Sequence, residues 1–170
     1  GVTAQGRFAA LTNYRDPGMA TAERSRGVLA AEYLCGDASA ATFAWQVQAD
    51  RGLYGGFSLL LADADELWCV GSHQAEPVRV APGWHGLSNA ALDAPWPKLE
   101  RLLAGAQTLV VQEVDAPASH LALLADTTPA QDDALPDTGV GLMMERLLSP
   151  VCIRTPAYGT RNSTWLRIGR

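Results

Sequence analysis

The side chains that most often perform chemistry in proteins, cysteine and histidine, are few and widely spaced in this chain of 170 residues. They are Cys35, Cys69, Cys152, His73, His85 and His120. No CxxC pair and no metal-ligand spacing of histidines occurs, so the sequence predicts neither a zinc site nor a disulfide framework. We expect buried thiols in a reducing cytosol, histidines that lie on the surface or in the core, and no metal or cofactor.

A second set of residues attracts more interest, because short motifs place glycine, asparagine and arginine at the ends of expected strands. In chain order these motifs are Phe8-Ala-Ala-Leu-Thr-Asn-Tyr-Arg15, Ser25-Arg26-Gly27, Tyr54-Gly55-Gly56-Phe57, Gly86-Leu87-Ser88-Asn89-Ala90, Pro95-Trp96-Pro97-Lys98, Leu135-Pro136-Asp137-Thr138-Gly139-Val140 and Tyr158-Gly159-Thr160-Arg161-Asn162-Ser163. Each motif is weak by itself. Together they make Asn13, Asn89 and Arg161 the candidate site residues.

In this order and at these spacings, the motifs resemble the NRDE family, also called the Transport and Golgi organisation 2 family. The resemblance runs from about Arg7 to Ile168, which is nearly the whole chain. Family members normally begin with Met-Cys, a strand and an Asn-Arg-Asp-Glu element, none of which precedes Gly1-Val2-Thr3 here. We therefore expect this chain to be the central and C-terminal part of a family member.

The family looks like the N-terminal-nucleophile (Ntn) hydrolases, especially the acylases that cut penicillin V and conjugated bile acids. In that fold the first residue of the mature chain is the nucleophile and its own α-amine is the base. The resemblance implies that Asn89 faces the substrate carbonyl, that Asn13 is a second oxyanion donor and that Arg161 favours the thiolate. Gly1 carries no nucleophilic side chain, and Thr3 could serve only after two residues were removed.

Simpler interpretations of the three candidates stay open. Asn89 is also suited to a helix cap or a turn, and Asn13 precedes a Pro-Gly turn where asparagine is common. Arg161 could instead pair with Asp16 or Glu145. The Ntn interpretation predicts that the three polar tips converge on one cleft, within about 10 Å of a common point, because all must reach one reacting carbonyl.

Two classes of function follow from the resemblance. The first is an amidase or acylase that cuts a small C–N bond with a cysteine outside this chain, so that residues 1–170 alone would not catalyse it. The second is a non-catalytic carrier, with roles in haem mobilisation, in lipid or acyl-CoA handling and, in eukaryotic members, in Golgi organisation. Either function suits a small, partly apolar ligand in a cleft near Tyr14, Trp84 and Trp96.

Composition excludes several other classes. The net charge is −5 and no run of basic residues occurs, which argues against nucleic acid as a partner. No apolar run reaches the ~18 residues that span a bilayer, and we expect a cytoplasmic protein without a transmembrane segment. The many arginines and alanines are typical of a GC-rich, bacterial genome. Oligomeric state is not predicted by any feature of the sequence.

The elements that must position the candidates are predicted as follows. Strands are expected at residues 7–12, 57–62, 67–70, 78–81, 151–153 and 164–168, and helices at 25–34, 39–49, 95–103, 119–125 and 143–148. Turns or loops are expected at residues 13–18 and 126–138. This pattern indicates one α+β domain over residues 1–170, most of an αββα Ntn-like sandwich truncated at its N-terminus.

Three local predictions depend on residue type. Ser25 is the expected N-cap of the first helix, whose apolar face would consist of Val28, Leu29, Ala31, Leu34 and Cys35. Phe43, Val47 and Trp45 are expected to point inward from the second helix. Residues 57–62 form an almost unbroken apolar run, so we expect a central strand with both faces buried.

Overall fold

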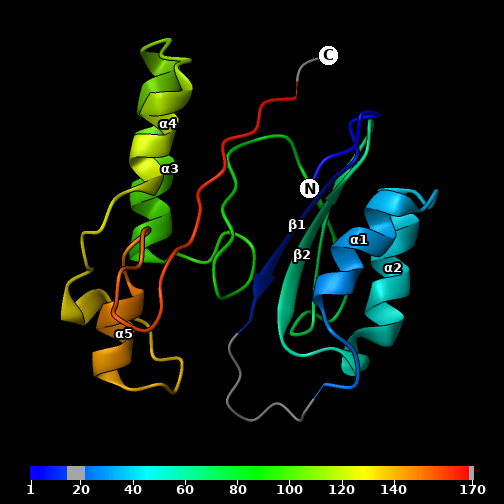
Figure 1. Cartoon of the computed structure of the whole chain (residues 1–170), viewed down its shortest axis with the longest axis horizontal. Coiled ribbons are helices and arrows are strands. Elements are labelled where there is room, and N and C mark those ends of the chain that lie inside the picture. The colour runs from blue at the N-terminus through cyan, green and yellow to red at the C-terminus, as the bar shows by residue number, and fades with distance from the viewer. Residues whose placement is uncertain (15–21, 169–170) are drawn as a thin grey trace. The chain divides into compact units, whose positions relative to one another are not determined.

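The computed structural model of the chain describes residues 1–14 and 22–168. Its elements are β1 (Phe8–Asn13), α1 (Gly27–Cys35), α2 (Ala40–Asp50), a 3-10 turn (Arg51–Leu53), β2 (Phe57–Ala62), β3 (Leu67–Gly71), β4 (Val78–Val80), α3 (Pro97–Val111), α4 (Pro117–Leu124), a 3-10 turn (Asp132–Ala134) and α5 (Leu142–Leu148). Helices and an antiparallel sheet occur together, which confirms the α+β class (Figure 1). Most of the turn predicted at residues 13–18 lies outside the described residues.

The described residues fall into two compact units. The first takes its residues from Gly1–Gly83 and Leu87–Leu92, and the second from Trp84–Gly86 and Asp93–Arg170. The single domain expected over residues 1–170 stays a prediction.

The first unit is built on one sheet, in which the strands pair in the order β1-β2-β3-β4, all antiparallel. Thr12 lies opposite Ser58, and Ser58 lies opposite Gly71. The hairpin predicted from the apolar runs at residues 57–62 and 67–70 is confirmed, as is the short strand that follows it. Because side chains alternate along a strand, this register decides which residues share a face of the sheet.

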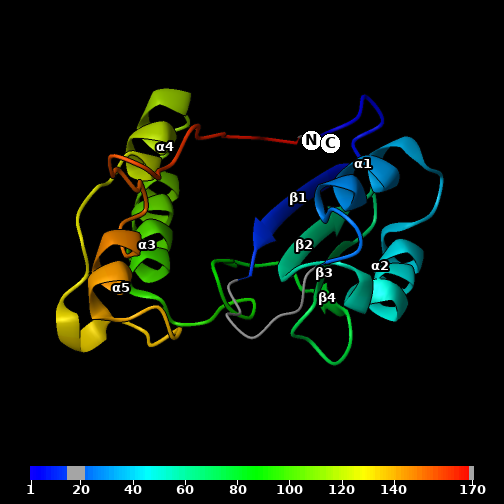
Figure 2. The same cartoon turned by 60° about the horizontal axis from the view of Figure 1, so that its bottom comes forward.

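Helices α1 and α2 pack against one face of this sheet (Figure 2). The core between them consists of Ala9, Leu29, Tyr33, Ala40, Ala44, Val47, Tyr54, Phe57, Leu59, Leu61 and Val70. Phe57, Leu59 and Leu61 are completely buried, so every second residue of β2 points toward the helices. On the opposite face of β2, Ser58 is buried and Leu60 is half-buried, so neither face of the strand is open to solvent.

The carboxylate of Asp63 joins the β2–β3 turn to helix α2. One of its oxygens accepts hydrogen bonds from the backbone N–H groups of Asp65 and Glu66, both at 3.1 Å. The other accepts from the N–H of Ala40 at 2.8 Å, in the first turn of α2. Burial by itself would raise the pKa of Asp63, but these three hydrogen bonds favour the ionised form more strongly and lower it.

Several predictions for α1 and α2 are wrong in detail. Helix α1 is capped by Arg26 rather than Ser25, whose hydroxyl accepts only a weak bond from the N–H of Gly27 at 3.4 Å. Cys35 is exposed, because α1 turns Leu29 and Tyr33 toward the sheet instead. The burial predicted for the other two cysteines is confirmed. On α2, Phe43 and Val47 point inward as expected, whereas Trp45 is 49% exposed. Ser39, predicted as the first residue of this helix, is its N-cap.

In the second unit, α3 begins at Pro97, at the end of the predicted Pro95-Trp96-Pro97 start, and continues to Val111, well beyond the predicted end at residue 103. Helix α4 packs closely on the part of α3 beyond residue 103, because Gly105 has no side chain. A Cβ at Gly105 would lie 2.7 Å from a methyl of Leu123. The helix ends at Val111 with Gln112 as its C-cap, and the next residue, Glu113, has a φ of 56°. The predicted loop at residues 126–138 and the last helix are confirmed.

The strands predicted at residues 151–153 and 164–168 are wrong. The first segment forms bends, and the second is extended but unpaired within the described residues. A single antiparallel bridge joins Arg154 to Gly159, and the N–H of Cys152 donates to the carbonyl of Asp126 at 2.7 Å. An extended sequence becomes a strand only when a partner satisfies its backbone groups, and none is adjacent in this part of the chain.

No helix in the described part of the chain is long and apolar enough to cross a membrane.

Candidate functional site

Asn13 is the last residue of β1, where it lies opposite Phe57 of β2. Its side chain is exposed and makes no hydrogen bond with any described residue. Backbone pairing continues one residue further, because the N–H of Tyr14 donates to the carbonyl of Gly56 at 2.9 Å. The amide of Asn13 is therefore held at the end of a well-paired strand, and neither of its N–H donors has a partner among the described residues.

Asn89 lies in a bend between β4 and α3, and its side chain is half-buried. The helix-cap alternative is wrong, since the N-cap of α3 is Trp96. The turn alternative agrees with the structure. Like Asn13, Asn89 belongs to the first unit, although 76 residues separate the two in sequence, as their numbers show.

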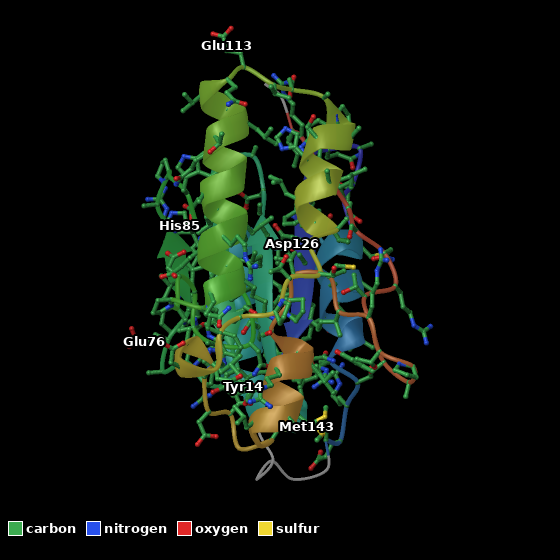
Figure 3. All side chains as sticks on the ribbon, turned by 90° about the vertical axis from the view of Figure 1, so that its left-hand side faces the viewer. Tyr14, Glu76, His85, Glu113, Asp126 and Met143 are labelled. Carbon is green, nitrogen blue, oxygen red and sulfur yellow. The ribbon has the colours of Figure 1, made fainter. Side chains whose placement is uncertain are left out.

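Three hydrogen bonds to Asp93 close the segment that carries Asn89. The N–H of Asp93 donates to the carbonyl of Gly86 at 2.8 Å, and the N–H of Gly86 donates to a carboxylate oxygen of Asp93 at 2.8 Å. The second carboxylate oxygen lies 2.7 Å from Nδ1 of His85, which stands beside α3 (Figure 3). Burial would raise the pKa of Asp93, but the bonds from His85 and Gly86 outweigh it and lower the pKa.

Arg161 lies in an irregular, exposed segment after the Arg154–Gly159 bridge, in the second unit. The alternative pairing with Glu145 is wrong, because the buried Glu145 carboxylate accepts from the N–H and the hydroxyl of Thr138, at 2.8 and 2.6 Å. The other suggested partner, Asp16, lies outside the described residues. Convergence of Arg161 with the two asparagines stays a prediction.

A row of polar groups on the sheet face away from α1 and α2 was missed by the sequence analysis. Thr12, Ser58 and Gly71 lie side by side across three strands, and the ring of His73 occupies the space where a Gly71 side chain would be, 2.8 Å from that position. The two hydroxyls and both ring nitrogens are buried without a hydrogen-bond partner among the described residues. Tyr14 stacks on the His73 ring, with centroids 4.1 Å apart.

The environment of this polar row favours uncharged groups. Burial lowers the pKa of His73 and so favours its neutral form. The neutral imidazole can donate one hydrogen bond and accept another, as can each hydroxyl. In the sequence, only Gly71, the glycine before Ser72-His73 at the end of a strand, hints at this row. A glycine at a strand end does not reveal which side chains meet.

The described residues contain no group of three or more His, Cys, Asp or Glu side chains that could hold a metal ion. An open depression of about 710 Å³ lies on the second unit, lined by residues 129–133 with Arg146 and Leu147. Arg146 pairs there with Asp132, so its charge is already compensated. None of the three candidate site residues lines this depression.

Comparison with known proteins gives one consistent family. The family model described as Transport and Golgi organisation 2 matches residues 1–170. A Transport and Golgi organization protein 2 homolog from cattle is 35% identical over 181 residues, and its human counterpart is 33% identical over 182. A mouse homolog is 32% identical over 181 residues. Each alignment covers 96% of this chain but only 64% of the relative, so the chain spans somewhat less than two thirds of these proteins.

Proposed function

The chain belongs to the Transport and Golgi organisation 2 family, and from this premise we propose that it forms part of an amide-bond hydrolase of the Ntn class. The nucleophile of this proposal, a cysteine, lies outside residues 1–170. The proposal is carried by one observation. Two amide side chains 76 residues apart, Asn13 and Asn89, belong to one compact unit, one at a strand end and one on a segment closed by Asp93.

The proposed chemistry assigns a role to each candidate. The cysteine thiol gives its proton to its own α-amine, and the resulting thiolate attacks the carbonyl carbon of the substrate amide. The side-chain N–H groups of Asn13 and Asn89 stabilise the oxyanion, and Arg161 favours the thiolate. The C–N bond breaks as the leaving nitrogen takes the proton from the α-ammonium group. Water then hydrolyses the acyl thioester, which restores the thiol.

We expect a small substrate with an apolar acyl group and no strong charge. The sheet end near Asn13 offers Tyr14, which is half-buried and stacked on a neutral His73. Pockets of this kind combine apolar or aromatic walls with a few polar groups that fix orientation.

The test is hydrolysis by the full-length protein, including the sequence encoded upstream of Gly1, of N-acyl amides with acyl chains of graded length. Products are followed by mass spectrometry, together with the acyl-enzyme. We expect Asn89→Ala and Asn13→Ala each to lower kcat by about 10²-fold or more, as loss of one oxyanion donor does elsewhere. Asn162→Ala is the matched control, because it removes an exposed amide that has no role in the proposal. The function would be rejected if Asn162→Ala lost activity while Asn13→Ala and Asn89→Ala kept it. It would also be rejected if the parent protein hydrolysed no amide.

One observation favours the carrier alternative. Several apolar side chains of the second unit are exposed, including Val110 and Val111 on α3 and Leu142, Met143, Met144 and Leu147 on α5. Met143 is 75% exposed and projects outward from α5 in Figure 3. An exposed apolar helix surface suits a hydrophobic ligand. This function is tested by titrating the protein with haemin and with palmitoyl-CoA while monitoring tryptophan fluorescence. Saturable binding would favour the carrier if Met143→Lys weakens it and Asn89→Ala leaves it unchanged.

A further inference from the structure

The segment between β4 and α3 is closed by a compact arrangement of His85, Gly86 and Asp93, which we name the Asp93 clasp. Asp93 forms two hydrogen bonds with the backbone of Gly86, one in each direction, and a third with the imidazole of His85. All three span no more than eight positions in sequence. They leave residues 87–92, with Asn89 among them, as a short segment whose two ends are held together.

The Asp93 clasp contains one locally unfavourable backbone conformation and one position that only glycine fits. Asp93 has a φ of 62°, in the left-handed region that residues other than glycine rarely occupy. Gly86 must lack a side chain, because a Cβ there would lie 2.6 Å from Cγ of Leu99 on α3. Such conformations persist where the surrounding contacts determine them strongly, and they concentrate at functional sites.

The chemistry of the Asp93 clasp also determines the state of His85. The hydrogen bonds that Asp93 accepts keep its carboxyl ionised near neutral pH, and an ionised carboxylate can only accept hydrogen bonds. The His85 nitrogen that faces it, Nδ1, must therefore carry the proton and donate. This bond holds the imidazole in a single orientation relative to Asp93.

We propose that His85 and Asp93 are positioning residues for Asn89. A six-residue segment with pinned ends has few accessible conformations, so the Asn89 amide is presented in one arrangement before any ligand arrives. Preorganised donors stabilise a developing charge better than donors that must first be ordered. The inference rests on the proposed function in one respect, namely that Asn89 is a site residue. The geometry of the clasp does not depend on it.

The first experiment uses Asp93→Asn in this chain, with ¹⁵N NMR of the histidine rings and of the side-chain amides. The new side chain can keep its oxygen on the N–H of Gly86, and it then turns its NH₂ group toward His85. Nδ1 of His85 must become an acceptor, so we expect the ring to change from the Nδ1–H to the Nε2–H tautomer. We also expect the Asn89 side-chain amide signals to shift and broaden, and exchange of the Gly86 amide to accelerate by about 10-fold.

Asp137→Asn is the matched control. Asp137 accepts a backbone hydrogen bond from Gly139 at 3.0 Å, so the variant removes the same charge from a similar turn elsewhere in the second unit. It should leave the His85 and Asn89 signals unchanged. If the His85 tautomer switches in Asp93→Asn while the Asn89 amide keeps its shift and its order, the clasp does not position Asn89 and the inference is wrong.

The second experiment is a double-mutant cycle on kcat with an N-acyl amide substrate and the full-length protein. We expect Asp93→Asn to lower kcat with little change in KM, and to cause little further loss when Asn89 is already alanine. Full additivity of the two losses would overturn the inference even if the proposed function is correct. If the parent protein hydrolyses no amide, the proposed function fails, and the NMR experiment still decides the positioning role.

Discussion

At the scale of single residues, the polar groups away from solvent are of two kinds, those with hydrogen-bond partners and those without a partner among the described residues. The carboxylates of the half-buried Asp63 and the buried Glu145 each accept two or more hydrogen bonds, so their burial is compensated. The groups of the row Thr12, Ser58 and His73 are buried without partners in the described part of the chain. A buried polar group without a partner costs about 1–3 kcal/mol. Such groups persist in folded proteins mainly where they serve a purpose other than stability.

His73 provides a test at this scale. Because burial lowers its pKa, the unfolded chain takes up a proton below pH ~6.5 that the folded chain does not bind. The free energy of unfolding should therefore fall as the pH decreases from about 6.5 toward the folded-state pKa. In urea titrations at several pH values, His73→Phe should remove this slope. At pH 7 it should be as stable as the parent or more stable, by up to about 1–3 kcal/mol, since the stacking on Tyr14 is kept and the unpaired nitrogens are lost.

His73→Gln separates the two effects in the same experiment. It also removes the titrating group, so the slope should disappear, but it keeps unpaired polar atoms and should bring no gain in stability. A slope that survives in both variants would mean that another group is responsible.

At the scale of elements, β2 is the strand on which the first unit depends. Leu59 is completely buried against the helices, whereas Leu60 points to the other face and is half-buried. Leu59→Ala should lower the free energy of unfolding by about 2–5 kcal/mol, the range for a fully buried leucine. The loss for Leu60→Ala should be smaller, about 1–2 kcal/mol, because less apolar surface is exposed to water. Equal losses in chemical denaturation would mean that the second face is as tightly packed as the first.

The turn between α3 and α4 gives a second prediction at this scale. Glu113 has a φ of 56° and follows α3, where its N–H donates to the carbonyl of Val110 at 3.0 Å (Figure 3). Glycine is the preferred residue at such a left-handed position after a helix. Glu113→Gly should therefore raise the free energy of unfolding by about 0.5–1 kcal/mol. Gln112→Gly, at a φ of −85°, is the matched control and should lower it.

At the scale of the whole molecule, the three candidate residues are divided between the two compact units. Asn13 and Asn89 belong to the first unit and Arg161 to the second. If Arg161 acts on the same reacting atoms, its side chain must approach that of Asn13 to within about 10 Å, because hydrogen-bond contacts of ~3 Å reach the reacting carbonyl from opposite sides.

A cross-linking experiment tests this approach. In a Cys35→Ser background, Asn13→Cys combined with Arg161→Cys should be joined within one chain by a bis-maleimide of about 10 Å reach, as detected by peptide mass spectrometry. Asn13→Cys combined with Glu113→Cys provides the comparison, since Glu113 has no part in the site. Equal cross-linking of both pairs would show only non-specific encounter. Absence of the Asn13–Arg161 product would remove Arg161 from the site.

The sequence alone determined those parts of the fold that depend on neighbouring residues. The β2–β3 hairpin follows from two apolar runs around an acidic turn, and the start of α3 near Pro97 follows from the prolines that precede it. The family was predicted correctly because its motifs occur in order along nearly the whole chain, and each motif is read without knowledge of contacts.

Only the tertiary structure decided which side chains meet. Trp45 and Cys35 look apolar in sequence, yet the direction in which α1 and α2 face the sheet leaves them exposed. The extended segment at residues 164–168 stays outside any sheet, because strand formation requires a partner that sequence does not specify. The Asp93 clasp and the row beside His73 depend on register, on a left-handed φ and on a missing Cβ. These are properties of three-dimensional contacts, which neighbouring residues in the sequence do not specify.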